Sequence, residues 1–158
     1  LEKAREYMEN HKFISGIIDC TSGMTFFGHK HSQIVSIKHP RANAGMQTIG
    51  NFKIKNGSLS TSGDYQLYFE HNGKRYHHIL NPFTGYPMEN IYSVTVIYPS
   101  ATLADGLSTA MFLLPPNQAI EALKHYPGSN AVIFYQENSQ IVSLKTLGMK
   151  ELDWHDEQ

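Results

Sequence analysis

The chain has 158 residues, which is enough for one domain with a sizeable core, and its 41% hydrophobic and 17% charged residues are ordinary for a globular protein. A formal net charge of -1 excludes the strong field of one sign that attracts nucleic acid or an anionic membrane. The single cysteine, Cys20, excludes an internal disulfide. We therefore expect a single domain over residues 1–158 that binds no nucleic acid.

The chain opens inside a charged amphipathic helical pattern over residues 1–11, without an initiator methionine, so we expect a piece of a longer protein. Strands follow, bounded by small residues, at 13–19, 24–28 and 33–38. Residues 39–47 are rich in turn-forming types and predict a surface loop. The pair Asn56-Gly57 lies between two alternating runs, which is the strongest short signal for a β-hairpin.

The middle of the chain predicts a short helix over 64–70, with Ser62 or Asp64 near its start. Asn72-Gly73 then turns the chain into a strand that begins at Lys74. The β-branched and aromatic run at 91–98 predicts a buried strand.

A helix is expected over 100–114 and ends at Pro115-Pro116, because proline disfavours helix in the residue before it. Its apolar residues at helical spacing form a stripe of Leu103, Leu107, Ala110, Met111 and Leu114. A second helix at 117–126 and a hairpin around 137–139 complete the chain. Hairpins mixed with helices predict an α+β fold with a mixed, mostly antiparallel sheet.

Asp105 and Thr109 are four residues apart in the helix expected over 100–114. Such residues share one helix face, here roughly opposite the leucine stripe, so the core does not require them. A carboxylate and a hydroxyl offer two hard oxygens, which suit Mg²⁺ completed by water and a substrate phosphate. The alternative is an exposed helix face with an acid near the N-terminus, where the helix dipole favours it.

Two adjacent histidines, His77 and His78, lie just before a proline-rich turn in KRYHHILNPFTGYP. Adjacent residues of a strand point to opposite faces, so at most one of them is expected to act in a given pocket. A histidine held at such a strand end can donate to a phosphate or move a proton near neutral pH. The alternative is a partly exposed histidine that caps a hairpin. A zinc site has less support, because neither this pair nor His29 and His31 have the spacing of zinc ligands.

Small polar residues at 60–65 lie between an expected strand and an expected helix. Their amides and hydroxyls, Ser62 among them, could bind an anion at the helix start or could simply cap the helix. The similar run at 20–23 matches neither the GxGxxG nor the Walker phosphate-loop pattern, and Cys20 has no evident partner base.

The order of these signals is more specific than any one of them. A Thr-Ser-Gly-x-Tyr segment at Thr61–Tyr65 precedes a His-x-x-Asn-Pro-x-Thr-Gly turn at His78–Gly85, and a helix with Ala-Asp and a threonine four residues later follows at Ala104–Thr109. This series resembles the FAD:protein FMN transferases, the ApbE-type flavin transferases. The resemblance is strongest over 59–114 and extends more loosely over nearly the whole chain.

The resemblance implies a transferase that uses Mg²⁺ to cleave the pyrophosphate of FAD, attaches FMN to a threonine of a target flavoprotein and releases AMP. It implies Asp105 and Thr109 as metal ligands and His78 as the catalytic residue. It also implies that His78, Ile79, Ser62 and Thr84 contact the cofactor. Because family members are often lipoproteins, it implies an extracytoplasmic location with membrane contact only through an upstream lipid anchor.

The chain departs from the family pattern at Asp19–Gly23, where a turn of the Asn-x-Gly-Gly type is common, and at Asn81, where many members have aspartate. The N-terminal portion of the family, which supplies much of the FAD pocket, is absent, so the resemblance covers the C-terminal portion. Two alternatives therefore stay open beside the transferase. One is an FAD pyrophosphatase that yields FMN and AMP, and the other is a non-catalytic flavin-binding module.

Overall fold

The computed structural model describes residues 1–41 and 47–157. Its centre is a six-stranded sheet in the order β1-β2-β5-β8-β9-β10, in which all neighbouring strands are antiparallel. The strands are β1 (Gly16–Asp19), β2 (Gly23–Phe27), β5 (Gly57–Gly63), β8 (Ile91–Tyr98), β9 (Asn130–Glu137) and β10 (Gln140–Lys145). The expected α+β class is confirmed.

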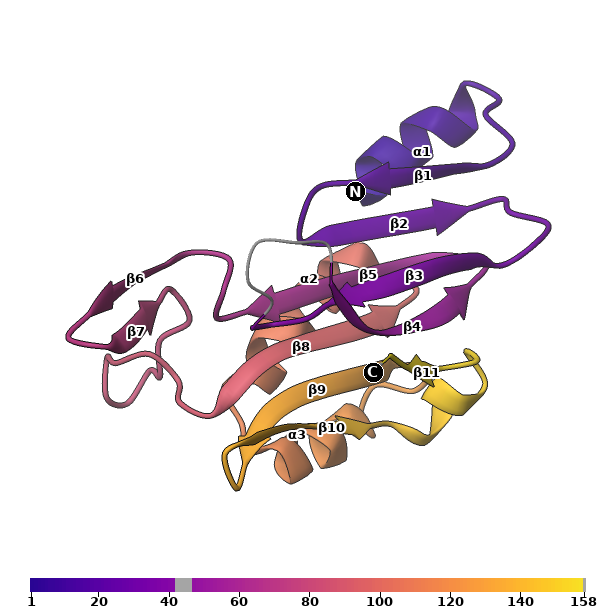
Figure 1. Ribbon diagram of the computed structural model, residues 1–158. Helices are drawn as coiled ribbons and strands as arrows, with labels where there is room; N and C mark the ends of the chain where they lie inside the picture. The colour runs from indigo at the N-terminus through magenta and orange to yellow at the C-terminus, as the bar shows by residue number, and fades with distance from the viewer. Residues whose placement is uncertain (42–46, 158) are drawn as a thin grey trace.

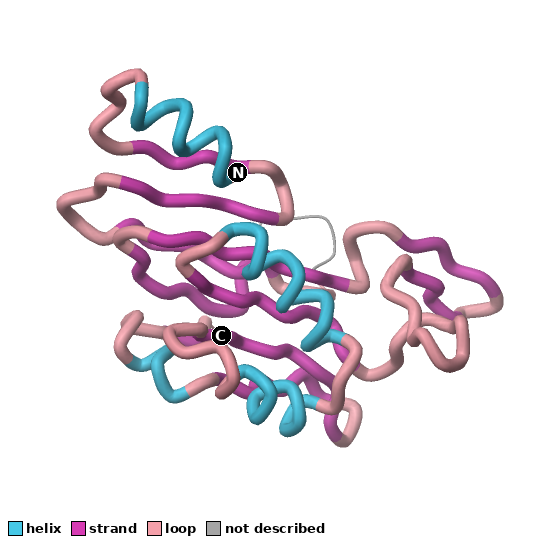
Figure 2. Tube along the Cα trace, turned by 180° about the vertical axis from the view of Figure 1, so that it is seen from behind, coloured by secondary structure: helices cyan, strands magenta, loops and turns pink. Residues whose placement is uncertain are grey.

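Two further layers cover the two faces of this sheet. Helices α2 (Ala101–Phe112) and α3 (Pro116–Leu123) lie on one face, as Figure 2 shows from behind. The other face carries a smaller sheet in the order β11-β4-β3 (Figure 1). Its strands are β3 (Gln33–Lys38), β4 (Thr48–Ile54) and β11 (His155–Asp156), and a 3-10 helix at Leu147–Lys150 lies between β10 and β11 in the chain.

The alternation of side chains along β8 divides the core between these layers. Val94 and Val96 pack under the helices, whereas Ile97 packs against the smaller sheet. Helix α1 (Glu2–Asn10) lies near the β1 edge and has no buried residue. It is tied to the start of α2 because the Glu2 carboxylate accepts hydrogen bonds from Ser100 and Thr102.

A two-stranded arm projects from one end of the large sheet (Figure 1). It consists of β6 (Tyr68–His71) and β7 (Lys74–His77), joined at Asn72-Gly73, where both residues have positive φ. The predicted turn is therefore confirmed. Positive φ at both positions matches the type I′ hairpin, which suits asparagine followed by glycine.

The helix expected over 64–70 is wrong. Asp64 to Leu67 form a turn, and β6 begins at Tyr68. Phe69 is paired with Tyr76 across the arm and stacks on its ring, with ring centroids 5.1 Å apart. Cross-strand aromatic pairing stabilises the hairpin, while a seven-residue helix is too short to be stable without packing.

The hairpin expected at Asn56-Gly57 is also wrong, although strands lie on both sides of it. β4 belongs to the smaller sheet and β5 to the larger one, so the chain crosses between layers here. Phe52 and Ile54 of β4 and Leu59 of β5 meet in the same core cluster. Because β4 and β5 belong to two sheets that pack face to face, their apolar side chains are buried between the sheets. If the two strands paired within one sheet, these side chains would share one face of that sheet and would not pack against each other.

The other expected elements are confirmed, with ends shifted by a few residues: the first helix, the strands at 13–38 and 91–98, the helices after 100 and 117, and the hairpin around 137–139. The loop expected over 39–47 lies mostly outside the described residues. No helix within residues 1–41 and 47–157 combines the length and apolarity required to cross a bilayer.

The C-terminal segment is pinned to β4. The carboxylate of Glu157 accepts hydrogen bonds from the Thr48 hydroxyl and the Asn51 amide. These bonds stabilise the ionised form, so they lower the pKa of Glu157. We therefore expect protonation of Glu157 to weaken the attachment of the C-terminal segment to β4.

Candidate active site

Helix α2 presents Asp105 and Thr109 on one exposed face, as their spacing predicts. The helix begins at Ser100, whose side chain accepts a hydrogen bond from the Leu103 amide and caps the first turn. Both side chains reach hydroxyl groups of the neighbouring strand β5. The pair therefore lies along the seam between helix and strand, where the strand can orient it.

The predicted apolar stripe of α2 is only partly correct. Leu107 and Met111 are buried, but Leu103 is 43% exposed and Ala110 is also exposed. The residues that share the buried face are Ala101, Ala104, Leu107, Ser108, Met111 and Phe112. In the first two turns most of these side chains are small, and the facing strand β5 carries serines. The helix therefore turns this face of small side chains, and not the predicted leucine stripe, toward β5.

Three serines of β5, Ser58, Ser60 and Ser62, alternate along the strand and are all buried. Ser60 Oγ lies 2.9 Å from Asp105 Oδ1 and donates to it. Ser62 Oγ lies 3.0 Å from Thr109 Oγ1. The strand therefore supplies one hydroxyl partner to each of the two predicted metal ligands.

The hydroxyl of Ser62, a residue predicted to contact the cofactor, is hydrogen-bonded to α2. Besides Thr109, its hydroxyl lies 2.9 Å from that of Ser108, and its side chain is 8% exposed. Because no helix begins after Gly63, the alternative role of helix capping is wrong for this residue. The structure assigns Ser62 to the support of Thr109, and its contact with a cofactor stays a prediction.

Asp105 and Thr109 can hold a hard cation only as part of a larger set of ligands. Asp105 Oδ2 has no protein partner in the described part of the chain, so one carboxylate oxygen is available. Within residues 1–41 and 47–157, no three His, Cys, Asp or Glu side chains cluster to hold an ion by themselves. A carboxylate with a hydroxyl fits Mg²⁺, which usually takes few protein ligands and keeps water and phosphate as the others.

A cavity of about 280 Å³ opens beside Asp105. It is lined by Leu1, Cys20, Ser22, Gly23, Ala101, Thr102 and Asp105. A second cavity, of about 420 Å³, shares Ser22 and extends along Thr61 and Tyr65 toward β3. The turn at which the chain departs from the family pattern therefore borders both hollows.

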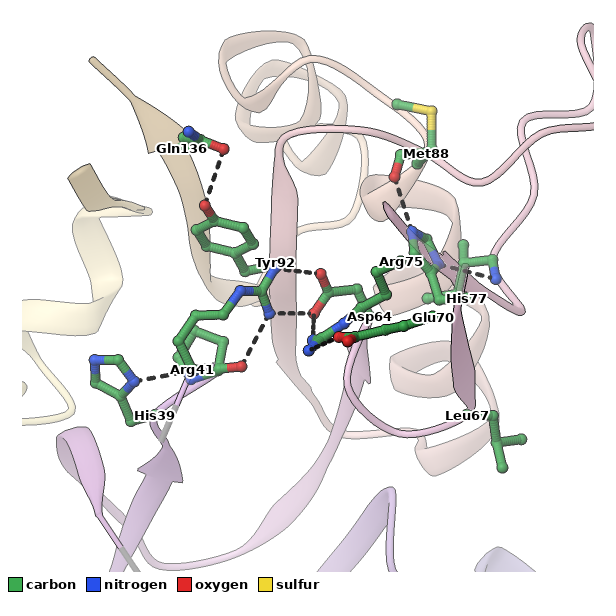
Figure 3. A network of polar contacts seen from close by, with 12 residues as sticks. His39, Arg41, Asp64, Leu67, Glu70, Arg75, His77, Met88, Tyr92 and Gln136 are labelled. Carbon is green, nitrogen blue, oxygen red and sulfur yellow. Dashed lines mark hydrogen bonds and ion pairs between the residues drawn. The ribbon is translucent and has the colours of Figure 1, made fainter. Parts of the chain in front are cut away.

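His77 and His78 point to opposite sides, as the strand pattern predicts. His77 is 5% exposed and uses both ring nitrogens: Nδ1 accepts from the Ile79 amide at 3.3 Å, and Nε2 donates to the Met88 carbonyl at 2.8 Å. The edge of its ring meets Phe112 at the end of α2, with ring centroids 5.7 Å apart. Figure 3 shows His77 with its bond to Met88. His77 is therefore a structural residue that seats the arm on α2.

His78 is exposed and has one ring nitrogen available. Its Nδ1 lies 3.2 Å from the Leu67 carbonyl, which can only accept, so Nδ1 carries the hydrogen in the neutral ring. Nε2 then has a free lone pair, and no protein partner contacts it in the described residues. This is the tautomer that a general base at Nε2 requires.

The turn after His78 is rigid. Asn81 Oδ1 accepts from the Phe83 amide at 2.9 Å, and the Asn81 carbonyl accepts from the Gly85 amide at 2.8 Å. The Thr84 hydroxyl accepts from the Tyr86 amide at 3.3 Å. Asn81 thus makes an Asx turn, which aspartate can also form, so the departure at this position leaves the turn intact.

Ile79 and Thr84, both predicted to contact the cofactor, lie in different surroundings. Ile79 is 5% exposed and packs into the core under α2. Thr84 is exposed and lines a hollow beside Lys74 and Glu89. The contact of either residue with a cofactor stays a prediction.

A partly buried ion pair at the base of the arm was not predicted from the sequence (Figure 3). Asp64 is 5% exposed and receives two hydrogen bonds from the Arg41 guanidinium, at 2.8 and 2.5 Å. Arg75 of β7 lies 3.8 Å from the same carboxylate, and Arg41 lies 3.9 Å above the Tyr92 ring. Burial opposes the charge of Arg41, but its bonds to Asp64 outweigh this and raise its pKa.

Helix α2 carries Asp105 and Thr109 and also contacts the arm that precedes His78. Phe112 contacts His77, and Asp105 precedes Phe112 by seven residues, or roughly 10 Å along the helix axis. The structure thus brings Thr109 into direct contact with Ser62, binds Asp105 to Ser60, and places His78 beside an arm that packs on the end of the same helix. Alternating serines in the β5 sequence were the available signal for the hydroxyl partners, whereas Arg41 gave no local signal.

The ApbE family model matches residues 1–134 of this chain. The chain belongs to the ApbE family. The FAD:protein FMN transferase of Klebsiella pneumoniae is 33% identical to this ApbE-family chain over 142 residues, which are 89% of this chain and 43% of that protein. The family resemblance inferred from the motifs is therefore confirmed.

Solved structures of ApbE proteins share the fold. The ApbE protein of Thermotoga maritima matches with a TM-score of 0.86 at 30% identity, covering 96% of this chain and 49% of that one. The apo form of the flavinyl transferase ApbE of Pseudomonas stutzeri matches with a TM-score of 0.74 at 29% identity, covering 96% and 47%. This ApbE-family chain therefore spans less than half the length of these relatives.

Proposed function

We propose that this chain forms part of an Mg²⁺-dependent FAD:protein FMN transferase, which moves FMN from FAD to a threonine of a target flavoprotein and releases AMP. The observation that carries the proposal is the seam between α2 and β5, where Asp105 and Thr109 lie together with one carboxylate oxygen available. Family membership and the name of the Klebsiella relative support the substrate pair. An extracytoplasmic, lipid-anchored location stays a prediction.

Each residue has a separate task in this reaction. The acceptor hydroxyl attacks the phosphorus on the FMN side, the bond from that phosphorus to the bridging oxygen breaks, and AMP leaves with that oxygen. His78 Nε2 takes the hydroxyl proton, because Nδ1 is bound to the Leu67 carbonyl. Asp105 and Thr109 would hold the divalent ion, whose chemistry is to offset negative charge on the phosphate oxygens.

The test is transfer of flavin to a target domain that bears an acceptor threonine, measured as covalent flavin fluorescence on a denaturing gel. The complete protein is incubated with FAD, Mg²⁺ and the target, and AMP is measured in parallel. We expect Asp105→Asn and His78→Gly each to lower the rate by at least about 100-fold, the scale of a lost general base or metal ligand. Thr109→Ser keeps the hydroxyl and should retain more activity than Thr109→Val.

The outcomes separate three functions. Labelled target with AMP supports the transferase. AMP and free FMN without labelling indicate an FAD pyrophosphatase, in which water is the acceptor. Flavin binding that gives no AMP and is unchanged in Asp105→Asn indicates a non-catalytic module.

A further inference from the structure

Ser60 lies one residue before the Thr-Ser-Gly segment, so the motif gives it no role. Its side chain is 1% exposed, and its hydroxyl lies between Asp105 Oδ1 at 2.9 Å and the Ser22 carbonyl at 3.2 Å. A hydroxyl has one proton and can donate to only one of these two acceptors at a time. Hydrogen bonds to a carboxylate are the stronger kind, so the proton belongs to Asp105.

The Ser22 carbonyl keeps a partner without this proton. It accepts from the Thr61 amide at 2.8 Å, which is a shorter contact than the one from Ser60. The turn at Cys20–Gly23 is also closed by its own bond, from the Cys20 amide to the Gly23 carbonyl at 2.9 Å. Ser60 is therefore not required to hold the turn, and its donated bond is available to Asp105.

Asp105 is held on one side only. Oδ1 is bound by a buried hydroxyl on a central strand of the large sheet, while Oδ2 has no protein partner in the described residues. An exposed aspartate on a helix otherwise samples several rotamers, and holding it in one of them reduces the entropy lost on binding an ion. The bond also directs the two oxygens to different tasks.

We propose that Ser60 is a positioning residue for Asp105, which holds Oδ1 so that Oδ2 meets a divalent cation. This inference rests on the proposed function, because it takes Asp105 as a metal ligand. It predicts that loss of the Ser60 hydroxyl weakens cation binding while the fold persists. Among the serines of β5, Ser60 is the one bonded to Asp105 in the described structure.

Ser58 provides a matched control on the same strand and the same face. It is 0% exposed, and its hydroxyl lies 3.0 Å from Thr25 Oγ1 and 3.4 Å from the Pro99 carbonyl, with no bond to Asp105. Ser58→Ala and Ser60→Ala remove the same group from equally buried positions. A general loosening of β5 affects both variants, whereas positioning of Asp105 affects Ser60→Ala alone.

The experiment measures binding of Mn²⁺ to the purified protein by electron paramagnetic resonance, without FAD or turnover. We expect Ser60→Ala to raise the dissociation constant about tenfold, the effect of one lost bond to a charged group. Ser58→Ala should change the dissociation constant by less than about twofold. Ser60→Thr, which keeps the hydroxyl, should retain most of the affinity. Circular dichroism confirms that each variant is folded. In turnover, Ser60→Ala should raise the Mg²⁺ concentration needed for half-maximal rate more than it lowers kcat.

Three results overturn the proposal. Wild-type affinity in Ser60→Ala, with weakened binding in Asp105→Asn, removes the role of Ser60 alone and leaves the proposed function intact. Equal weakening in Ser58→Ala shows that the strand as a whole matters. Wild-type affinity in Asp105→Asn removes the metal site and with it both proposals.

Discussion

Replacing His77 by phenylalanine tests whether the buried histidine is structural. The new ring has a similar size and can keep the edge contact with Phe112, but it loses both hydrogen bonds. The Ile79 amide and the Met88 carbonyl are then left without their partners. The change therefore isolates the polar role of His77 from its packing.

The magnitude follows from the burial of the two orphaned groups. Ile79 is 5% exposed, so its unpaired amide costs about 1–3 kcal/mol, while the half-buried Met88 carbonyl can regain water and costs less. We expect the free energy of unfolding to fall by about 2–3 kcal/mol. For a chain of this length, that corresponds to a Tm lower by roughly 5–10 °C.

The assay is urea unfolding followed by circular dichroism, with His78→Phe as the control. His78 is exposed, so its replacement should change the unfolding free energy by less than about 0.5 kcal/mol. A His77→Phe variant as stable as the wild type would refute the reasoning, because the two bonds would then contribute nothing. A large loss in His78→Phe would refute the division of roles between the histidines.

Three further predictions concern other parts of the fold. Asp64→Asn should lower the free energy of unfolding, measured in urea titrations, by about 2 kcal/mol, which is less than for a fully buried pair because Arg41 is one-third exposed. Unchanged stability would contradict a stabilising role for the ion pair. Because the folded-state pKa of Glu157 is lowered, its ionised form stabilises the fold above the unfolded pKa of 4.5, and this stability is lost as the pH falls through the folded-state pKa. Hydrogen-exchange protection of β11 should therefore drop in acid. A Glu157→Gln variant that keeps the same pH dependence would contradict this prediction. Gly50→Ala places a Cβ against the Trp154 ring, so the free energy of unfolding should fall by about 1–3 kcal/mol and the near-ultraviolet circular dichroism spectrum should change. An unchanged spectrum and stability would show that the ring moves freely.

Most of the elements could be predicted because their signals are local. The run at 91–98 became β8, and Asn72-Gly73 became the turn of the arm, since residue type and alternation act over a few neighbours. The turn at Asn56-Gly57 has an equally strong local signal, yet the strands beside it joined different sheets. Which sheet a strand joins depends on apolar residues far along the chain, and no local pattern carries that information.

The candidate site divides in the same way. Helical spacing alone predicts that Asp105 and Thr109 share a face, and strand alternation alone predicts that His77 and His78 diverge. Which histidine is buried, and which β5 hydroxyls meet α2, depends on contacts such as that between Ser60 and Asp105, 45 residues apart. These contacts form when α2 packs on β5. The close approach of small side chains decides which face of the helix meets the strand, and the helix pattern by itself does not contain that information. The sequence by itself thus determined the chemical groups and their order, and the tertiary structure decided which of them meet.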